Sequence, residues 1–328
     1  MDRPVIRCYH KVSMKVLVVG GAGYIGGAVT DCLIQSGVDF TVYDNLVYER
    51  QYLKPVDFIF GDVRDTAKLG KILPNFTHII WLAAIVGDGA CQVDPPTTVA
   101  VNQESVKWLA DNFNGRIIFL STCSVYGQAD SWLDEASAVN PLSLYAQTKL
   151  EAEKYLTSKN ALVFRLGTAY GLSDIHSRIR LDLAVNYMTM NAIATNALTV
   201  FGGDQWRPFI HVKDIARCIV AGLDKDWIGI YNLATSNIQI NDLSRMIAEE
   251  TGCEVTYAER RFADPRNYRV HTDRARQLGL LQSATQFDVH FGIGEIARLV
   301  RSGRIKDVNH PVYSNEKHLA TQLSNGKL

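Results

Sequence analysis

The chain lacks the features that mark membrane, metal-binding and disulfide-stabilised proteins. None of its apolar runs approaches the ~20 residues that a helix needs to cross a bilayer. The first 13 residues have neither the apolar segment nor the small-residue cleavage site of a secretory signal. The six cysteines form no C-x-x-C pair and show no metal-ligand spacing. We therefore expect free thiols in a reducing cytoplasm, no bound metal and no membrane partner.

An excess of charge of either sign is also missing. Lys plus Arg and Asp plus Glu number 34 each, so no global field attracts the protein to nucleic acid or to an anionic surface. Any anionic ligand must be held by locally placed groups. The 328 residues, 47% of them hydrophobic, are enough for a large α/β domain and a smaller second one.

The first half of the chain alternates short apolar runs with helical stretches. Residues 15–19 (KVLVV), for example, are β-branched and apolar, as expected of a strand buried on both faces. Strands that alternate with helices predict a parallel sheet with right-handed crossovers and helices on both faces. We expect strands at 15–19, 40–43, 58–60, 78–82, 116–120 and 162–165, and helices at 24–36, 66–72, 97–112 and 141–158.

The rhythm changes after about Gly171. We expect helices at 180–194, 212–223 and 240–252, short strands at 198–201 and 230–233, and loops at 202–208 and 259–269. The predicted fold class is α/β: a Rossmann-type doubly wound parallel sheet with a smaller, partly interleaved C-terminal α/β substrate lobe.

A glycine-rich turn, Gly20-Gly21-Ala22-Gly23-Tyr24-Ile25-Gly26, lies between the first strand and the first helix. In this context the glycines allow a tight turn and a close approach of the backbone to a pyrophosphate, and the helix N-terminus attracts phosphate. Asp44 ends the second strand, 24 residues beyond Gly20. A carboxylate there accepts both hydroxyls of an adenosine ribose and repels a 2′-phosphate, which favours NAD over NADP. Asp62 follows the third strand, where an adenine contact and a turn-forming role both remain open.

Tyr145 and Lys149 are four residues apart, on one face of a predicted helix. A free tyrosine has a pKa near ~10, and a nearby ammonium lowers that pKa toward the range of a useful base. An ordinary surface pair is the competing interpretation. Hydroxyl groups follow the fifth strand, at the carboxyl edge where doubly wound sheets bind ligands. We expect Thr122, or as second choice Ser124, to hold the reacting oxygen beside the phenol.

Taken together, these motifs resemble those of the extended short-chain dehydrogenase/reductases of the nucleotide-sugar epimerase and dehydratase kind. The resemblance extends from Lys15 to about Leu281. It is carried by the glycine turn, Tyr43-Asp44-Asn45, Gly61-Asp62, Leu82-Ala83-Ala84, Val101-Asn102, Ser121-Thr122, Val125-Tyr126-Gly127, Tyr145 with Lys149, Arg165 with Tyr170-Gly171, and Arg207 with His211-Val212 and Asp214.

The resemblance implies roles for individual residues. Tyr145 would take the proton from a sugar hydroxyl that Thr122 binds, and Lys149 would hold the nicotinamide ribose. The substrate would be a nucleotide-diphosphate sugar, contacted by Ser124, Arg207 and two residues with an open alternative: Arg266, which could equally be a solvated part of a basic loop, and Asn186, which could equally be a buried structural amide. The implied cofactor-binding residues are Gly20, Gly23, Tyr24, Ile25, Gly26, Asp44, Asn45, Asp62, Val63, Leu82, Ala83, Ala84, Asn102, Tyr145 and Lys149.

The resemblance also implies a division of the chain and a homodimer. Residues 14–171 would form the NAD-binding domain and residues 172–308 mainly the substrate lobe, with a leader at 1–13 and a polar tail at 309–328. Family members commonly pair through a four-helix bundle, to which residues 97–112 and 145–158 would correspond here.

The family's pattern is not matched everywhere. Dehydratases of the family carry an acidic pair after the catalytic threonine, where this chain has Cys123 and Ser124, and Thr168 replaces an asparagine that usually touches the substrate diphosphate. The leading hypothesis is therefore an NAD-dependent nucleotide-sugar epimerase, acting at sugar carbon 4. A nucleotide-sugar dehydrogenase or 4-ketoreductase is the alternative, and a 4,6-dehydratase or a non-catalytic NAD-sensing regulator is less favoured. Residues 85–95 are expected to form a long loop that shapes sugar specificity.

Overall fold

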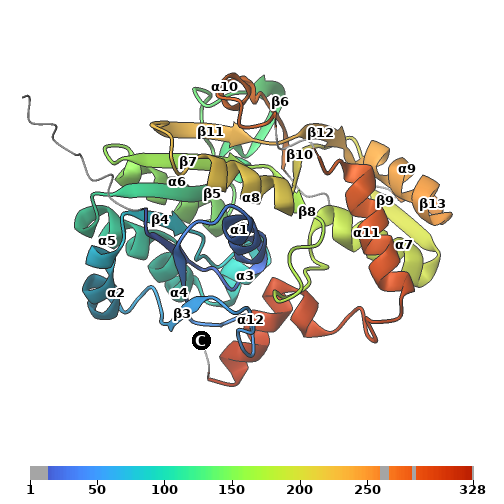
Figure 1. The fold of residues 1–328 in the computed structure, drawn as a ribbon. Helices are drawn as coiled ribbons and strands as arrows, with labels where there is room; N and C mark the ends of the chain where they lie inside the picture. Colours follow the sequence, from blue (N-terminus) through green and yellow to red (C-terminus); the bar gives the residue numbers. More distant parts are fainter. Residues whose placement is uncertain (1–13, 259–265, 283–285, 327–328) are drawn as a thin grey trace, which may run out of the picture.

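A computed structural model describes residues 14–258, 266–282 and 286–326 of the chain. Its centre is a seven-stranded sheet in the order β11-β7-β5-β4-β1-β2-β3, with every neighbouring pair parallel (Figure 1). This confirms the predicted α/β class. The strands are β1 (Val16–Val19), β2 (Phe40–Asp44), β3 (Asp57–Phe60), β4 (His78–Trp81), β5 (Arg116–Thr122), β7 (Ala161–Leu166) and β11 (Gly229–Leu233).

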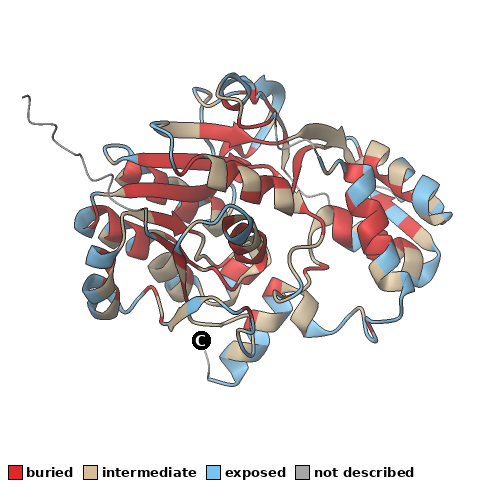
Figure 2. Cartoon of the chain, viewed as in Figure 1, coloured by how far each residue is buried: buried red, intermediate tan, exposed pale blue. Residues whose placement is uncertain are grey.

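Helices cover both faces of this sheet, because its central strands are apolar on both sides. All four residues of β1 are buried, with Val16 and Val18 in one hydrophobic cluster and Leu17 and Val19 in the other. Figure 2 shows the buried central strands as a red layer. The first cluster is completed by α1 (Tyr24–Gln35) and α8 (Val212–Ala221), and the second by α2 (Thr66–Ile72), α5 (Ser105–Asn112) and α6 (Leu144–Leu156).

A smaller lobe packs beside the main sheet (Figure 1). It has its own hydrophobic cluster, which includes Tyr170, Phe209 and Ile293. The elements of this lobe are β8 (Thr168–Tyr170), β9 (Ala197–Phe201), β10 (Trp206–His211), β12 (Ser236–Gln239), β13 (Glu254–Ala258), α7 (Ala184–Thr195), α9 (Ile240–Thr251) and α11 (Val289–Arg301).

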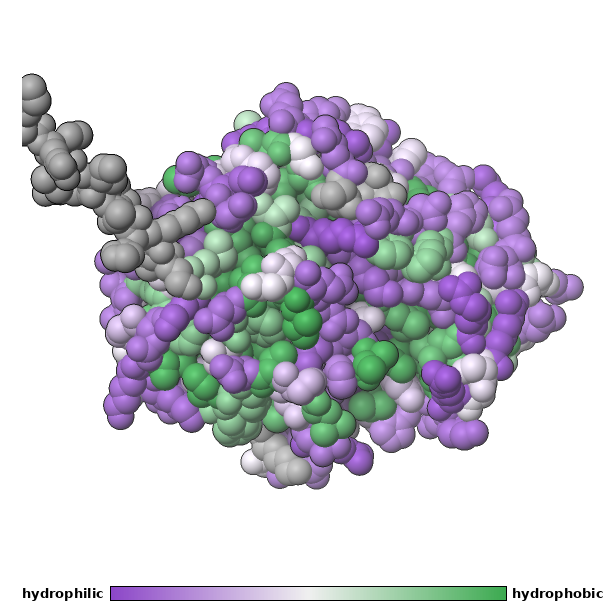
Figure 3. All heavy atoms as spheres, in the orientation of Figure 1, coloured by the Kyte–Doolittle hydropathy of each residue, from purple (hydrophilic) through white to green (hydrophobic). Residues whose placement is uncertain are grey.

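On the face drawn in Figure 3, hydrophilic residues lie along the outer rim of the molecule and apolar residues gather nearer the middle.

Several elements differ from those expected from the sequence. Residues 85–95, expected as a loop, contain α3 (Asp88–Val93), and β10 begins inside the expected loop 202–208. The helix expected at 97–112 is divided into α4 (Pro95–Val99), a π-helical turn (Ala100–Glu104) and α5. Elements not expected from the pattern are β6 (Gln128–Leu133), β14 (Asn267–Val270) and α10 (Asp273–Gln277), together with β8, β12, β13 and α11 of the smaller lobe.

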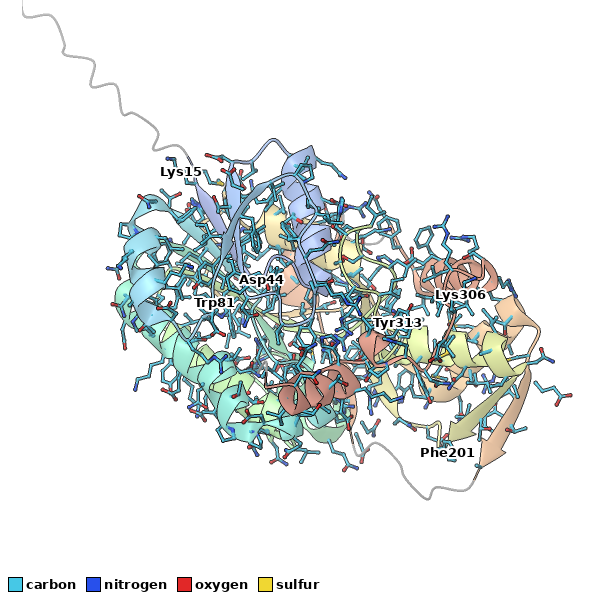
Figure 4. The ribbon with its side chains drawn as sticks, turned by 90° about the horizontal axis from the view of Figure 1, so that it is seen from below. Lys15, Asp44, Trp81, Phe201, Lys306 and Tyr313 are labelled. Atoms are coloured by element: carbon cyan, nitrogen blue, oxygen red, sulfur yellow. The ribbon has the colours of Figure 1, made fainter. Side chains whose placement is uncertain are left out.

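The segment 309–328 contributes a helix, α12 (Asn315–Ser324), which packs against α3. Its N-terminus is capped by the Ser314 side chain, which accepts a hydrogen bond from the backbone N–H of Lys317. Leu319 is 1% exposed, and Asn315 is 4% exposed. The C-terminal segment thus packs, through α12, against α3 of the N-terminal half of the chain, close to the carboxyl edge of the main sheet (Figure 4).

Two further observations concern membrane-spanning helices and the cysteines. Within the described ranges, no helix is long and apolar enough to span a bilayer. The described cysteines, Cys32, Cys91, Cys123, Cys218 and Cys253, carry free thiols. Cys8 and the rest of the leader 1–13 lie outside the described residues.

Candidate active site

A cavity of about 450 Å³ opens at the carboxyl ends of β1, β2 and β4. This is where open α/β sheets bind their ligands. Most of the predicted cofactor residues line it: Gly20, Gly23, Tyr24, Ile25, Gly26, Asp44, Asn45, Asp62, Val63, Leu82, Ala83 and Ala84. Asn102, Tyr145 and Lys149 are not part of its lining.

The glycine turn leaves no room for side chains where it passes the sheet. Gly20 has φ +84°, and a Cβ atom on it would lie 2.4 Å from the backbone nitrogen of Ala83. A Cβ on Gly26 would lie 2.5 Å from the carbonyl oxygen of Gly21. Gly23, which precedes α1, has only the oxygen of Gly20 within 4 Å of such an atom. The turn therefore brings bare backbone and the N-terminus of α1 to the wall of the cavity.

Asp44 connects the glycine turn to the end of β2. Its Oδ2 accepts a hydrogen bond of 3.0 Å from the backbone N–H of Ala22, and its Oδ1 accepts one of 2.7 Å from Leu46. Burial raises the pKa of Asp44 above its ordinary value, and these backbone donors oppose that effect. Because a carboxylate has about four acceptor positions, these bonds leave acceptor capacity for a ligand.

Asp62 lies beside Asn45 at the same end of the cavity. Its Oδ2 accepts a hydrogen bond of 2.9 Å from Asn45, and the Arg64 guanidinium forms an ion pair with it at 2.8 Å. Burial acts to raise the pKa of Asp62, but the hydrogen bonds from Arg64 outweigh it and the pKa is lowered. Asp62 is therefore charged, and it also accepts the backbone N–H of Arg64 two residues later, as a turn-forming aspartate does.

Tyr145 stands at the start of α6, whose N-cap is Ser143. It packs in a cluster with Val47, Ile85 and Leu319, three residues that also line the cavity, so it lies just behind the cavity wall. The Thr122 side chain lies close enough to this hydroxyl to act against the rise in its pKa. The structure therefore brings together the phenol and the hydroxyl that the sequence placed far apart.

The electrostatics of Tyr145 differ from our expectation. Burial raises the pKa of its phenol, and the largest charge effect that opposes burial comes from Arg180, not from Lys149. Lys149, 3% exposed, lies over the ring of Phe119, with its Nζ 4.2 Å from the ring centre. Burial lowers the pKa of Lys149 to about 7, although Glu153 acts in the opposite direction. With these pKa values, neither the phenol of Tyr145 nor the amine of Lys149 carries a full charge at neutral pH.

Asn102 serves the backbone of a neighbouring loop. Its Oδ1 accepts a 2.8 Å hydrogen bond from the N–H of Ile85, and its Nδ2 donates one of 2.9 Å to the carbonyl of the same residue. Ile85 itself lines the cavity. Asn102 thus positions a wall residue instead of reaching the cavity.

The predicted substrate residues fall into two groups. Ser124 lies 3.3 Å from the hydroxyl of Tyr268, and the Arg207 guanidinium donates to the carbonyl of Arg266. The guanidinium of Arg266 in turn lies 3.4 Å from Asp88 of α3. Tyr268 links the two parts of this set, because the Arg207 guanidinium lies 5.6 Å from its ring centre. Asn186, by contrast, is completely buried, and its amide group binds the backbone of Gly171 and Arg180. That arrangement matches the structural interpretation of Asn186.

Further residues of the cavity were not expected from the sequence: Val47, Tyr48, Glu49, Arg178, Arg180, Asn315 and Leu319. They come from the loop after β2, from the segment before α7 and from α12. No local motif marks them, since only the fold brings these three segments together. In Figure 4, Tyr313, in the turn before α12, lies between Asp44 and the smaller lobe.

With this geometry the chain can be compared with known proteins. The model of the NAD dependent epimerase/dehydratase family matches residues 16–234, more than half of the chain. The chain belongs to this family. The predicted resemblance is thereby confirmed, and the protein is an NAD-dependent enzyme of the epimerase/dehydratase type.

Curated relatives and solved structures agree with the family. The chain is 26% identical to the UDP-glucose 4-epimerase of Corynebacterium glutamicum over 80% of its own length and 89% of that protein. It is 28% identical to the UDP-glucose 4-epimerase of Rhizobium meliloti, with 80% and 90% covered. The NAD complex of the Thermus thermophilus UDP-glucose 4-epimerase has a TM-score of 0.74 at 24% identity, covering 88% of this chain and 99% of that one. The dTDP-glucose 4,6-dehydratase DesIV of Streptomyces venezuelae has a TM-score of 0.76 at 22% identity, covering 91% and 100%.

The cavity fits the family's cofactor. The glycine turn leaves backbone and a helix N-terminus for the diphosphate, and the Asp44 carboxylate keeps acceptor capacity for ribose hydroxyls. A 2′-phosphate beside this carboxylate would be repelled, so the residues at this end of the cavity suit NAD. Metal ligands form no cluster of three or more His, Cys, Asp or Glu within the part of the chain that is described.

Proposed function

We propose that this protein is a nucleotide-sugar epimerase that inverts carbon 4 of the sugar, using NAD. The observation that carries the proposal is the position of the Tyr145 phenol, which lies beside Thr122 and packs on residues that line the cofactor cavity. A phenol beside a second hydroxyl, at the carboxyl edge of the sheet, is placed to exchange a proton with a sugar hydroxyl. The names of the relatives, UDP-glucose 4-epimerases among them, point to the same reaction.

In the proposed reaction, the phenolate form of Tyr145 accepts the proton of the 4-hydroxyl while the sugar is oxidised to a 4-keto form. Bound NAD supplies the reversible two-electron chemistry. Thr122 donates to the same sugar oxygen and keeps it within reach of the phenol. After the keto sugar has rotated and presents its other face, Tyr145 returns its proton to the oxygen on the inverted carbon. Lys149, one helical turn from Tyr145, holds the nicotinamide ribose.

A 4,6-dehydratase is disfavoured by the groups that follow Thr122. Cys123 is fully buried, its thiol donates to the carbonyl of Arg165, and burial raises the pKa of that thiol. Ser124 has no acidic proton to offer. Water loss needs an acid and a base at this place, and these two residues supply neither.

Mass spectrometry distinguishes the epimerase from a dehydrogenase or 4-ketoreductase. The purified protein is incubated with a panel of nucleotide-diphosphate sugars, without added cofactor, and products are separated by chromatography. An epimerase converts a sugar to an isomer of the same mass, because the NAD it carries is regenerated in each cycle. A product lighter or heavier by two hydrogens, formed only when cofactor is added, would contradict the proposal and support the oxidoreductase.

We also propose that the protein works as a homodimer in the cytoplasm. The free thiols of the described cysteines suit a reducing compartment. Helices α5 and α6, the segments that would form the four-helix bundle, pack against each other on one face of the sheet. Light scattering after size-exclusion chromatography measures the mass, and a single-chain mass would exclude the dimer.

A further inference from the structure

Two buried arginines from the segment before α7 line the cavity together with the glycine turn. Arg178 is 8% exposed and Arg180 is 9% exposed, and both belong to the cavity wall. Arginine is rarely buried so deeply without an anionic partner, because removing its charge from water is costly. The contacts of each guanidinium group therefore show whether its positive charge already has a negative partner.

The contacts of Arg178 are almost all with neutral groups. Its guanidinium donates to the carbonyl of Val312 and to the amide oxygen of Asn315, and it lies 4.8 Å from the ring centre of Tyr48. Its Nε is buried and has no hydrogen-bond partner among the described residues. The side-chain hydroxyl of Tyr48, which also lines the cavity, is buried and unpartnered in the same way.

Arg180 is paired, and it lies beside the start of α1. Its guanidinium makes two hydrogen bonds, of 2.9 and 3.1 Å, to the carboxylate of Asp182. It also lies 5.9 Å from the ring centre of Tyr24, the first residue of α1. Arg180 therefore lies beside the side chain of the first residue of α1.

The two charges are not balanced by the carboxylates around them. Asp182 neutralises Arg180, and its pKa is lowered by that arginine although burial acts against this. Glu49, the other carboxylate beside Arg178, accepts only its backbone N–H, and burial raises the pKa of Glu49 to about 7. At neutral pH the charge of Arg178 is thus only partly compensated by its neighbours, and burial together with Arg180 lowers the pKa of Arg178 to about 10.

The segment that carries the pair is fixed to α1 at several points. The hydroxyl of Tyr24 donates to the carbonyl of Gly171, and Ser173 donates to the carbonyl of Tyr24. Asp174, whose side chain is 2% exposed, forms a buried ion pair with Lys54 at 2.7 Å. The arginines are therefore held against the glycine turn by rigid contacts, and Asn315 adds a contact from α12.

We propose that Arg178 and Arg180 form the second half of the diphosphate site for the cofactor, opposite the backbone N–H groups of the glycine turn. This inference rests on the cofactor site described above and deepens it. A diphosphate between the helix N-terminus and the two guanidinium groups receives charge-assisted hydrogen bonds from both sides. The same ligand supplies the counter-charge that the contacts of Arg178 lack.

A diphosphate could also come from the substrate, and the location decides between the two sources. Arg178 and Arg180 share the cavity with Asp44 and Gly20, whereas the predicted substrate residues Arg207 and Arg266 are outside its lining. We therefore assign the pair to the cofactor. Because ADP and UDP carry the same diphosphate on different bases, they separate the two possibilities experimentally.

The test compares ligands with and without the diphosphate. Dissociation constants of ADP, adenosine and UDP are measured by calorimetry for the wild type and for Arg178→Gln, Arg180→Gln and the double variant. Each substitution should weaken ADP binding roughly tenfold or more, the range of one charge-assisted hydrogen bond, and leave adenosine binding within about twofold. Arg178→Lys, which keeps the charge, should recover much of the ADP affinity. Arg245→Ala, which removes an exposed arginine on α9, is the matched control.

Three results would overturn the proposal. The first is an equal loss of ADP and adenosine affinity, which would give the arginines a purely structural role. The second is a loss confined to UDP, which would place them in the substrate site. The third is unchanged ADP affinity in the double variant. None of these results depends on sugar conversion, so failure of the arginine assignment and failure of the proposed epimerase reaction are separate outcomes.

Discussion

The ammonium group of Lys149 lies over the face of the Phe119 ring, 4.2 Å from its centre, and Tyr145 precedes this lysine by one helical turn. The aromatic face offers partial compensation for a charge removed from water. Burial nevertheless lowers the pKa of Lys149 from 10.5 to about 7. The residue expected to supply a permanent positive charge is thus close to its own titration point.

This titration predicts a stability that depends on pH. Between the lowered pKa of folded Lys149, about 7, and its ordinary value of 10.5, the unfolded chain keeps a proton that the folded protein has released. Stability contributed by this group therefore rises as pH increases through that window. Urea unfolding at roughly pH 7 and roughly pH 9.5 should therefore show that the wild type gains stability relative to Lys149→Met over this interval. Equal pH dependence in both proteins would contradict the lowered pKa.

Replacing the phenol tests the centre of the proposed reaction. Tyr145→Phe removes the hydroxyl beside Thr122 and keeps the packing against Ile85 and Leu319. Turnover should fall by roughly two to four orders of magnitude, the contribution of one acid–base group, while NAD affinity stays within about twofold. Steady-state kinetics and NAD titration measure the two quantities. Near-normal turnover would remove Tyr145 from the chemistry.

The choice of cofactor is predicted to depend on Asp44. Asp44→Ala removes the acceptor for the ribose hydroxyls and the charge that repels a 2′-phosphate. It also removes the hydrogen bond to the backbone of Ala22 in the glycine turn. NAD should bind more weakly, and the preference for NAD over NADP should shrink. The ratio of the two dissociation constants is the measurement, and an unchanged ratio would count against the ribose assignment.

The close approach of the glycine turn to the end of β4 gives a stability prediction with a built-in control. Gly20 and Gly37 both have positive φ, 84° and 63°, but only at Gly20 would a Cβ collide with backbone, 2.4 Å from the nitrogen of Ala83. Gly37→Ala should cost about 1 kcal/mol through backbone conformation alone. Gly20→Ala should cost several times more, because the chain must also shift. Thermal unfolding compares the two, and equal costs would show that the turn relaxes freely.

Much of the nucleotide half could be predicted from the sequence, because its signals are local. A buried apolar strand, a glycine turn and a following helix determine one another within about 20 residues. The parallel sheet was predicted for the same reason, and so were the positions of Gly20 and Asp44 in its cavity. Short or discontinuous elements such as α3 and β10 were missed, since their packing partners are far away in the chain.

By itself, the sequence determined the order of strands and helices, the nucleotide-binding turn and the pairing of Tyr145 with Lys149 on one helix. Only the tertiary structure decided what surrounds these groups: the position of Arg178 and Asn315 in the cavity, and the burial that shifts the pKa values of Tyr145 and Lys149. The local residue pattern determines which segments form strands, turns and helices. Desolvation and long-range charge depend on segments that lie far apart in the chain, and these meet only when the fold is complete.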